Sequence, residues 1–183
     1  MPNRLTKGRG LFGSINVPAA GLRIADDPVD ATAAELDRAA DASARIVALA
    51  AATLTVTEAL HDGKVIVVDR AAGSTLTLPA ATGSGTKIHV VVKTTITSTN
   101  LIIQVVGDDT MTGIAQIAQD AADTIVAFET AADSDTITMN GSTKGGIKGD
   151  SIELIDIAAD LWWVRVMASG TGTEATPFSA AVV

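Results

Sequence analysis

The chain has 183 residues and a mass of 18.5 kDa, and 47% of its residues are hydrophobic, so it can bury one compact core. It contains no cysteine, which excludes disulfides and thiolate metal sites, and no apolar run reaches the roughly 18 residues that a membrane-spanning helix needs. The formal net charge of −8 is unevenly spread, because the first 25 residues carry four basic side chains and no acidic one. No signal peptide is visible, and we expect a soluble protein made in the cytoplasm.

The kind of apolar residue points to a fold class. The chain has 32 alanines and 23 threonines together with many valines, isoleucines and leucines, but only three phenylalanines, two tryptophans and no tyrosine. Threonine, valine and isoleucine are β-branched, so they lose rotamer freedom in helices and fit the pleated surface of a sheet. The composition therefore predicts a mainly β core.

Residues 1–29 contain several glycines and prolines and no hydrophobic periodicity, which predicts an extended N-terminal arm. A disordered tail is the alternative, but large apolar side chains in a free tail favour aggregation, so we expect them to be buried on a partner. An acidic protein surface fits the basic charges better than nucleic acid, because four charges spread over 20 residues make a weak phosphate patch. The expected docking residues are Arg4, Lys7, Arg9, Leu11, Phe12, Ile15 and Val17.

A short helix and connector are expected over residues 30–50. Thr32-Ala-Ala-Glu35 has the spacing of a capping box, in which the threonine hydroxyl and the glutamate satisfy each other's backbone N–H groups. The alanine-rich segment that follows predicts a helix from 33 to about 42, with 50 as its furthest end. Residues 46–49 could equally begin a strand.

From residue 53 onward, short apolar or alternating runs recur at the spacing of β-sandwiches and barrels. They predict a single β-sandwich or barrel-like domain of about ten short strands over residues 51–183, ending in a C-terminal extension. We expect hairpin turns at Asn140-Gly141 and at residues 158–160, and we find no repeat of 20–50 residues. The runs are 54–57, 64–69, 74–78, 88–93, 101–106, 110–118, 124–128, 135–139, 151–157 and 161–167.

Metal-binding patterns are weak. His61 lies between Glu58 and Asp62, but three ligands this close on one turn have poor geometry, and a solvated turn is the better interpretation. His89 falls in a valine-rich strand, where we expect it on the solvent face. The pairs 108–109 and 133–135 contain aspartates but lack the spacing of a calcium loop, so we interpret them as exposed loop acids.

Catalytic patterns are equally weak, and we expect no enzyme, no catalytic residue and no cofactor. Ser84 between two glycines does not match the G-x-S-x-G motif of a nucleophile elbow. The glycine-rich stretch from Lys144 to Lys148 is not followed by a helix that could bind phosphate, and it is interpreted as a loop.

Trp162 and Trp163 are adjacent in a predicted strand, so their rings must point to opposite faces. We expect one ring to fill the core and the other to be exposed. An exposed tryptophan would be the starting point for a carbohydrate-binding surface.

Several segments resemble proteins of tailed-bacteriophage virions. Residues 30–41 are similar to a segment that recurs in phage structural proteins, including tail fibres, and residues 75–85 resemble a strand-and-turn segment of the same proteins. Residues 134–154 and 170–179 resemble small proteins encoded beside major capsid proteins.

This resemblance covers about residues 30–183 and implies a capsid decoration (cement) protein. Such a protein has a β-fold, is typically trimeric, and sits on the outer surface of the expanded head, so its implied partners are the major capsid protein and further copies of itself. The basic arm departs from the generic body and is where specificity for the shell would lie. Two alternatives stay open: a tail, fibre or baseplate component, and a module that binds glycans on the host surface.

Overall fold

The computed structural model of the chain describes residues 23–24, 27–28, 45–121 and 123–182. The arm residues expected to dock and the predicted helix over 33–42 lie outside these ranges. Residues 1–41 belong to a separate unit, in which β1 (Arg23–Ile24) and β2 (Asp27–Pro28) form a short antiparallel pair.

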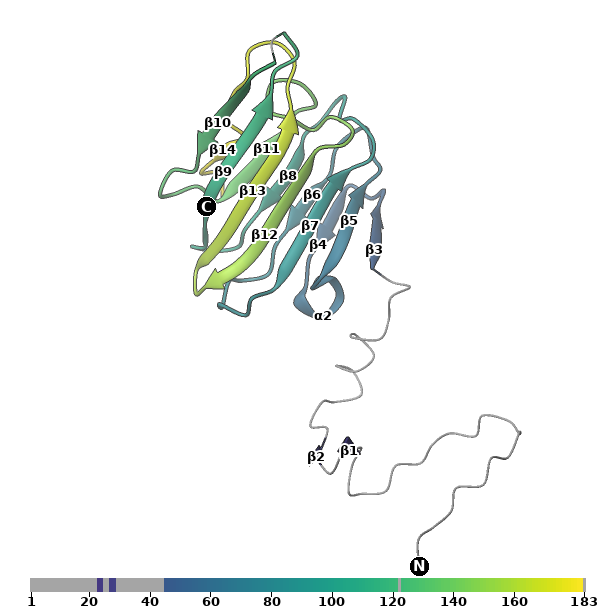
Figure 1. Cartoon of the computed structure of the whole chain (residues 1–183), viewed down its shortest axis with the longest axis vertical. Helices are drawn as coiled ribbons and strands as arrows, with labels where there is room; N and C mark the ends of the chain where they lie inside the picture. Colours follow the sequence, from purple (N-terminus) through teal and green to yellow (C-terminus); the bar gives the residue numbers. More distant parts are fainter. Residues whose placement is uncertain (1–22, 25–26, 29–44, 122, 183) are drawn as a thin grey trace, which may run out of the picture. The chain divides into compact units, whose positions relative to one another are not determined.

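The second unit is a two-layer β-sandwich, and the mainly β prediction is confirmed. Figure 1 shows one sheet in front of the other. The seven-stranded sheet has the order β10 (Ile125–Glu129), β9 (Thr110–Ala118), β13 (Leu161–Ser169), β12 (Ser151–Ala158), β7 (Lys87–Val92), β5 (Lys64–Val68) and β3 (Ile46–Leu49). The five-stranded sheet has the order β14 (Phe178–Ser179), β11 (Thr136–Met139), β8 (Leu101–Gln104), β6 (Thr75–Thr77) and β4 (Thr53–Thr55), and a single turn of helix, α2 (Glu58–His61), precedes β5.

The first half of the sandwich is built from three stacked coils. Each coil places one strand in each sheet, first β3 and β4, then β5 and β6, then β7 and β8, and equivalent strands pair in parallel. The register aligns Ile46 with Val65 and Val65 with His89, so successive coils advance by 19 and then 24 residues. Because the coils differ in length, their apolar positions do not recur at a fixed spacing, and the sequence shows no repeat.

In the second half of the sandwich most neighbouring strands are antiparallel. This half contains both segments that the sequence predicts to be hairpins. The β12–β13 hairpin is confirmed, with Asp160 at φ 61° in its turn. The Asn140-Gly141 hairpin is wrong, because β11 pairs with β8 and β14 while β12 pairs with β7 and β13. Gly141 does have a positive φ of 75°, and a Cβ there would lie 1.8 Å from the Ile96 carbonyl oxygen. The pair therefore forms a tight bend that leads the chain from one sheet to the other.

The core lies between the two sheets and is filled by alternate residues of each strand. Its largest member is Trp162, which is fully buried. Two strands were not among the ten predicted runs. The first, β3, begins the sheet at Ile46, ahead of the expected domain start at residue 51, and gives residues 46–49 the strand conformation. The second, β14, places Phe178 of the C-terminal extension in the core.

Candidate interaction surface

The outer face of the seven-stranded sheet is the face turned away from the five-stranded sheet, and it is viewed directly in Figure 1. Successive side chains of a strand point to opposite faces. In β13 the inward Trp162 is fully buried, whereas the outward Trp163 is half-buried and the outward Met167 is 44% exposed. The strand registers carry this alternation across all seven strands and so define which residues form the outer face.

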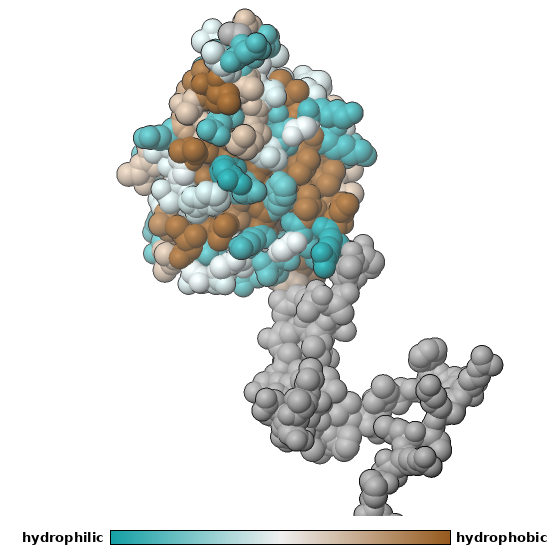
Figure 2. Space-filling model, in the orientation of Figure 1, coloured by the Kyte–Doolittle hydropathy of each residue, from teal (hydrophilic) through white to brown (hydrophobic). Residues whose placement is uncertain are grey.

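This outer face is unusually apolar for a surface that nothing in the described chain covers. A sandwich normally places polar side chains at these positions. Figure 2 shows apolar side chains distributed over the whole face, between polar ones. The large apolar residues that point outward are Ile46, Val65, Val67, Val91, Ile114, Ile125, Ile155, Ile157, Leu161, Trp163 and Met167.

A row of polar side chains crosses the middle of the face. The registers place His89 of β7, Glu153 of β12 and Arg165 of β13 side by side. The Arg165 guanidinium donates to the Glu153 carboxylate at 2.6 Å, and its carbon lies 5.9 Å from the centroid of the Trp163 ring. Both ion-pair partners are more than 40% exposed, so the pair adds little stability and instead fixes the positions of the two charges.

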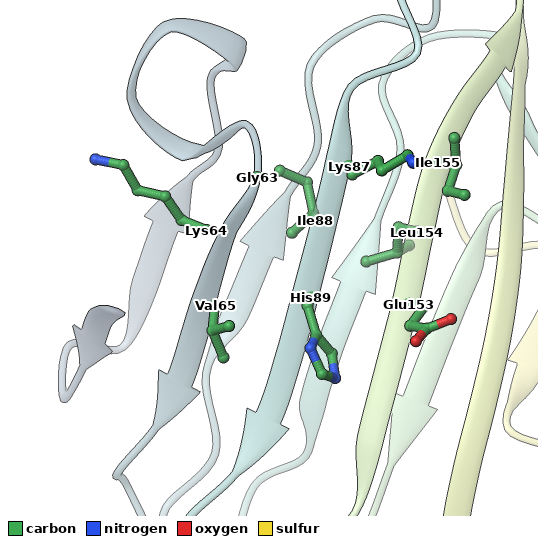
Figure 3. Close-up of a pocket in the computed structure, with 9 residues that line it drawn as sticks. All are labelled: Gly63, Lys64, Val65, Lys87, Ile88, His89, Glu153, Leu154 and Ile155. Atoms are coloured by element: carbon green, nitrogen blue, oxygen red, sulfur yellow. The ribbon is translucent and has the colours of Figure 1, made fainter. Parts of the chain in front are cut away.

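A hollow of about 370 Å³ lies beside this row, at the junction of β5, β7 and β12. Figure 3 shows Val65, His89 and Glu153 in one row across the three strands, with Ile155 further along β12. Its lining combines apolar side chains with His89, Glu153 and the two lysines Lys64 and Lys87, so the hollow offers both apolar and charged contacts to a side chain of a docked partner.

The structure separates the two tryptophans as predicted. Trp162 fills the core, and its indole Nε1 finds no hydrogen-bond partner among the described residues. Trp163 is the tryptophan on the outer face, and its cross-strand neighbours are Ile155 on β12 and Thr112 on β9. Its surroundings therefore include both apolar and polar side chains.

The interpretation of His61 as part of a solvated turn is wrong. The side chain is 5% exposed at the end of α2, and its Nδ1 accepts a hydrogen bond from the Thr57 backbone N–H at 3.0 Å. This bond joins the last residue of α2 to Thr57, the residue that precedes the helix, and so spans its single turn. His89, expected on the solvent face, does point outward and is half-buried in the hollow.

The interpretation of the loop aspartates as exposed is wrong for two of them. Asp109 is 6% exposed and accepts the Ala81 N–H at 2.7 Å. Asp135 is 7% exposed and accepts the N–H groups of Ala181 and Val182 at 2.7 and 3.0 Å, which ties down the C-terminal segment. Buried backbone N–H groups need acceptors, and an ionised carboxylate is a strong one.

Ser84 belongs to a structural cluster around Asp156, which is 1% exposed. The Asp156 carboxylate accepts the backbone N–H groups of Thr82, Gly83 and Ser84 at 2.7 to 3.0 Å and the Ser84 hydroxyl at 2.9 Å. Burial raises the pKa of Asp156, but these hydrogen bonds to its charged form outweigh the burial and hold the pKa below its ordinary value. The serine is therefore a loop anchor and not a free nucleophile.

Asp150 plays a similar role for the glycine-rich loop from Lys144 to Lys148. It accepts the N–H groups of Gly146 and Ile147 at 2.8 and 2.9 Å and that of Ser169 at 2.9 Å. Here burial is the dominant effect and raises the pKa of Asp150, although these hydrogen bonds oppose it. The loop prediction is thus confirmed, and the acceptor that closes the loop is a buried carboxylate.

The outer-face residues other than Trp163 and His89 are not singled out by the sequence analysis. A signal was present nonetheless: the run from Leu161 to Met167 is apolar at nearly every position, which is typical of strands covered on both faces. An apolar run does not state what covers each face of its strand, and the second apolar side becomes visible only when the registers align the strands.

Within residues 45–121 and 123–182, no group of three histidine, cysteine, aspartate or glutamate residues is arranged to hold a metal ion. None of the described helices is long and apolar enough to cross a membrane. Comparison of the sequence with models of known protein families and with curated proteins finds no match.

Proposed function

We propose that this protein is a structural component of a tailed-bacteriophage virion that decorates and stabilises the assembled capsid as an oligomer, with a trimer as the expected form. The observation that carries the proposal is the broad apolar outer face on a two-layer sandwich whose loops are anchored by buried carboxylates. A rigid body with an uncovered apolar surface is suited to permanent contact with other subunits. The resemblance of residues 30–183 to phage virion proteins supports the same assignment.

The N-terminal arm is the proposed contact with the major capsid protein. Its apolar residues Leu11, Phe12, Ile15 and Val17 would contribute buried area at about 25 cal/mol per Å², opposed by the cost of ordering the segment. Arg4, Lys7 and Arg9 would meet acidic groups of the shell. Linking several arms in one oligomer multiplies these weak contacts through avidity.

Stabilisation of the shell needs no chemistry under this proposal. A protein that binds only the assembled shell stabilises that state in proportion to the logarithm of its concentration over Kd. With many copies on each head, even roughly 1–2 kcal/mol per copy, an amount typical of a modest interface contact, adds to the stability of the shell against the pressure of packaged DNA. The proposed location is therefore the outer surface of the capsid.

The decisive experiment compares purified particles that contain the protein with particles that lack it. Particles lacking it should release their DNA at a lower temperature, and adding the purified protein back should restore the higher release temperature. Equal heat resistance of the two kinds of particle, with no binding of the added protein, would contradict the proposal.

A tail, fibre or baseplate component and a module that binds glycans on the host surface are the two alternatives to a capsid role, and Trp163 is the residue that glycan binding would use. Carbohydrate sites surround an aromatic ring with convergent polar groups. The neighbours of Trp163 across the sheet are the apolar Ile155 and the small Thr112, and the Arg165 guanidinium carbon lies 5.9 Å from the ring centroid. This surrounding suits a protein contact better than a sugar.

A further inference from the structure

The outer face of the seven-stranded sheet has an electrostatic character different from the rest of the body. Residues 45–182 carry eight basic and fifteen acidic side chains, a net charge of −7. The charged side chains that point outward on the face are Lys87, Arg165, Glu129 and Glu153, which cancel one another. All seven excess acidic residues therefore lie elsewhere on the body.

This charge distribution favours a second copy of the chain as the partner that binds the outer face. Two copies of the chain that approach through an acidic part of the surface repel each other more strongly than two copies that approach through the neutral face, where only the net charges of the two bodies oppose contact. A strongly acidic or basic partner, in turn, gains nothing from this face, where two of the four charges already form the Glu153–Arg165 ion pair.

The size of the face is sufficient for a stable contact. Seven strands spaced about 4.8 Å apart span roughly 29 Å, and six residues of strand span roughly 20 Å, which gives about 600 Å². A specific interface buries at least about 500 Å² on each partner and typically about 800 Å². The face also offers Trp163 and Met167, two residue types that are enriched in the centres of interfaces.

We infer that the outer face of the seven-stranded sheet is the surface through which copies of this chain associate. The inference deepens the proposed function and rests on its claim that the protein acts as an oligomer. Packing this face on a neighbouring copy removes the outward apolar side chains of β12 and β13 from water, including Ile157 and Met167, which are 47% and 44% exposed in the isolated chain. The hollow lined by His89 and Glu153 then receives a side chain of the neighbour.

Two single substitutions test this surface in the full chain. Ile157→Asp and Met167→Asp each place a charge on the face, in neighbouring strands, and both positions are exposed enough to tolerate aspartate in a monomer. Sedimentation equilibrium should give a multiple of 18.5 kDa for the wild type at micromolar concentration and a rise in Kd of at least roughly 30-fold for each variant. Leu60→Asp is the matched control, because Leu60 is 62% exposed on α2, outside the sheet, and this substitution should leave the mass unchanged.

A second measurement does not depend on disrupting the face. Because the chain has no cysteine, Thr112→Cys on the outward side of β9 and Thr173→Cys in an exposed loop each provide one thiol for maleimide labelling. Raising the protein concentration should slow labelling at position 112 and leave position 173 unaffected. Added salt should strengthen association, since it screens the repulsion between two bodies of charge −7.

Each outcome separates this inference from the proposed function. A wild type that stays monomeric, or an oligomer that both face variants leave intact, overturns the inference, even if the protein still binds capsids. Concentration-dependent protection of position 112 together with dissociation of the face variants supports it, even if the protein fails to bind particles. If raising the protein concentration slows labelling at position 173 and not at position 112, the contact lies on another surface, and this result also overturns the inference.

Discussion

Buried carboxylates are the residues that hold the loops of this sandwich in place. Asp109, Asp135, Asp150 and Asp156 are each less than 8% exposed, and each accepts backbone N–H groups from a loop or terminal segment. Exposed loop acids would leave these N–H groups to water. The buried ones replace water with a fixed acceptor, and they reduce the freedom of segments that have no strand partners.

Asp156→Asn should destabilise the protein at neutral pH by about 2 kcal/mol, because the amide keeps one acceptor oxygen and loses the charge that strengthens the hydrogen bonds from residues 82–84. Thermal or urea unfolding at pH 7 measures this difference. Asp108→Asn is the control, since Asp108 is exposed.

The stability difference between the wild type and Asp156→Asn should depend on pH. The folded pKa of Asp156 lies below its ordinary value, so its contribution is complete above the unfolded pKa of about 3.9 and is lost as pH falls through the lower folded pKa. The stability difference between wild type and Asp156→Asn should therefore shrink below about pH 4. A difference that stays constant down to pH 2 would show that the charge of Asp156 contributes nothing.

Elements at the two ends of the sandwich domain complete the sheets. The body begins with β3 at the edge of the seven-stranded sheet, and it closes with β14, which pairs with β11 in the five-stranded sheet. The pairing of β14 brings the Phe178 ring into the core, and the Asp135 carboxylate holds the residues that follow. The C-terminal extension is therefore a structural part of the sandwich.

Phe178→Ala should cost about 3 kcal/mol, because it leaves a cavity where a core ring was and weakens the docking of the last strand. For a domain of this size the melting temperature should fall by roughly 6–12 °C. Phe128→Ala is the comparison, since Phe128 is only partly buried at the edge strand β10 and its loss should cost less. Equal losses for the two variants would mean that β14 is not packed as described.

At the scale of the whole molecule, the proposed roles divide between the two units of the chain. The sandwich has its own core and anchored loops, so it needs no contact with residues 1–29 to fold. Capsid docking is proposed for the arm, and self-association for the outer face of the seven-stranded sheet. Two separate surfaces predict that one activity can be removed without the other.

Deleting residues 1–29 should leave a folded oligomer that no longer binds capsids. Circular dichroism and sedimentation check the fold and the mass, and cosedimentation with particles checks binding. Replacing Leu11, Phe12, Ile15 and Val17 with serine, while keeping Arg4, Lys7 and Arg9, separates the apolar contribution from the basic one. A truncated protein that binds as well as the full chain would leave the arm without a docking role.

The sequence alone determined the fold class and most strand positions. β-Branched and alternating runs marked ten strands, each within a few residues of its observed bounds, because side-chain alternation and β-propensity are local properties. It also placed one tryptophan in the core and joined β12 to β13, since both follow from neighbours in the chain.

Apart from the β12–β13 hairpin, only the tertiary structure decided which strands pair, and with them the candidate surface. The three parallel coils, the path from Asn140-Gly141 into the other sheet and the burial of Asp109 and Asp135 all depend on partners 19 or more residues away. The apolar outer face arises in the same way, because Ile114, Ile155 and Met167 come to lie on one face only through the registers of β9, β12 and β13. A local pattern states that a residue is apolar, but whether that residue faces the core or a partner is set by the sheet that forms around it.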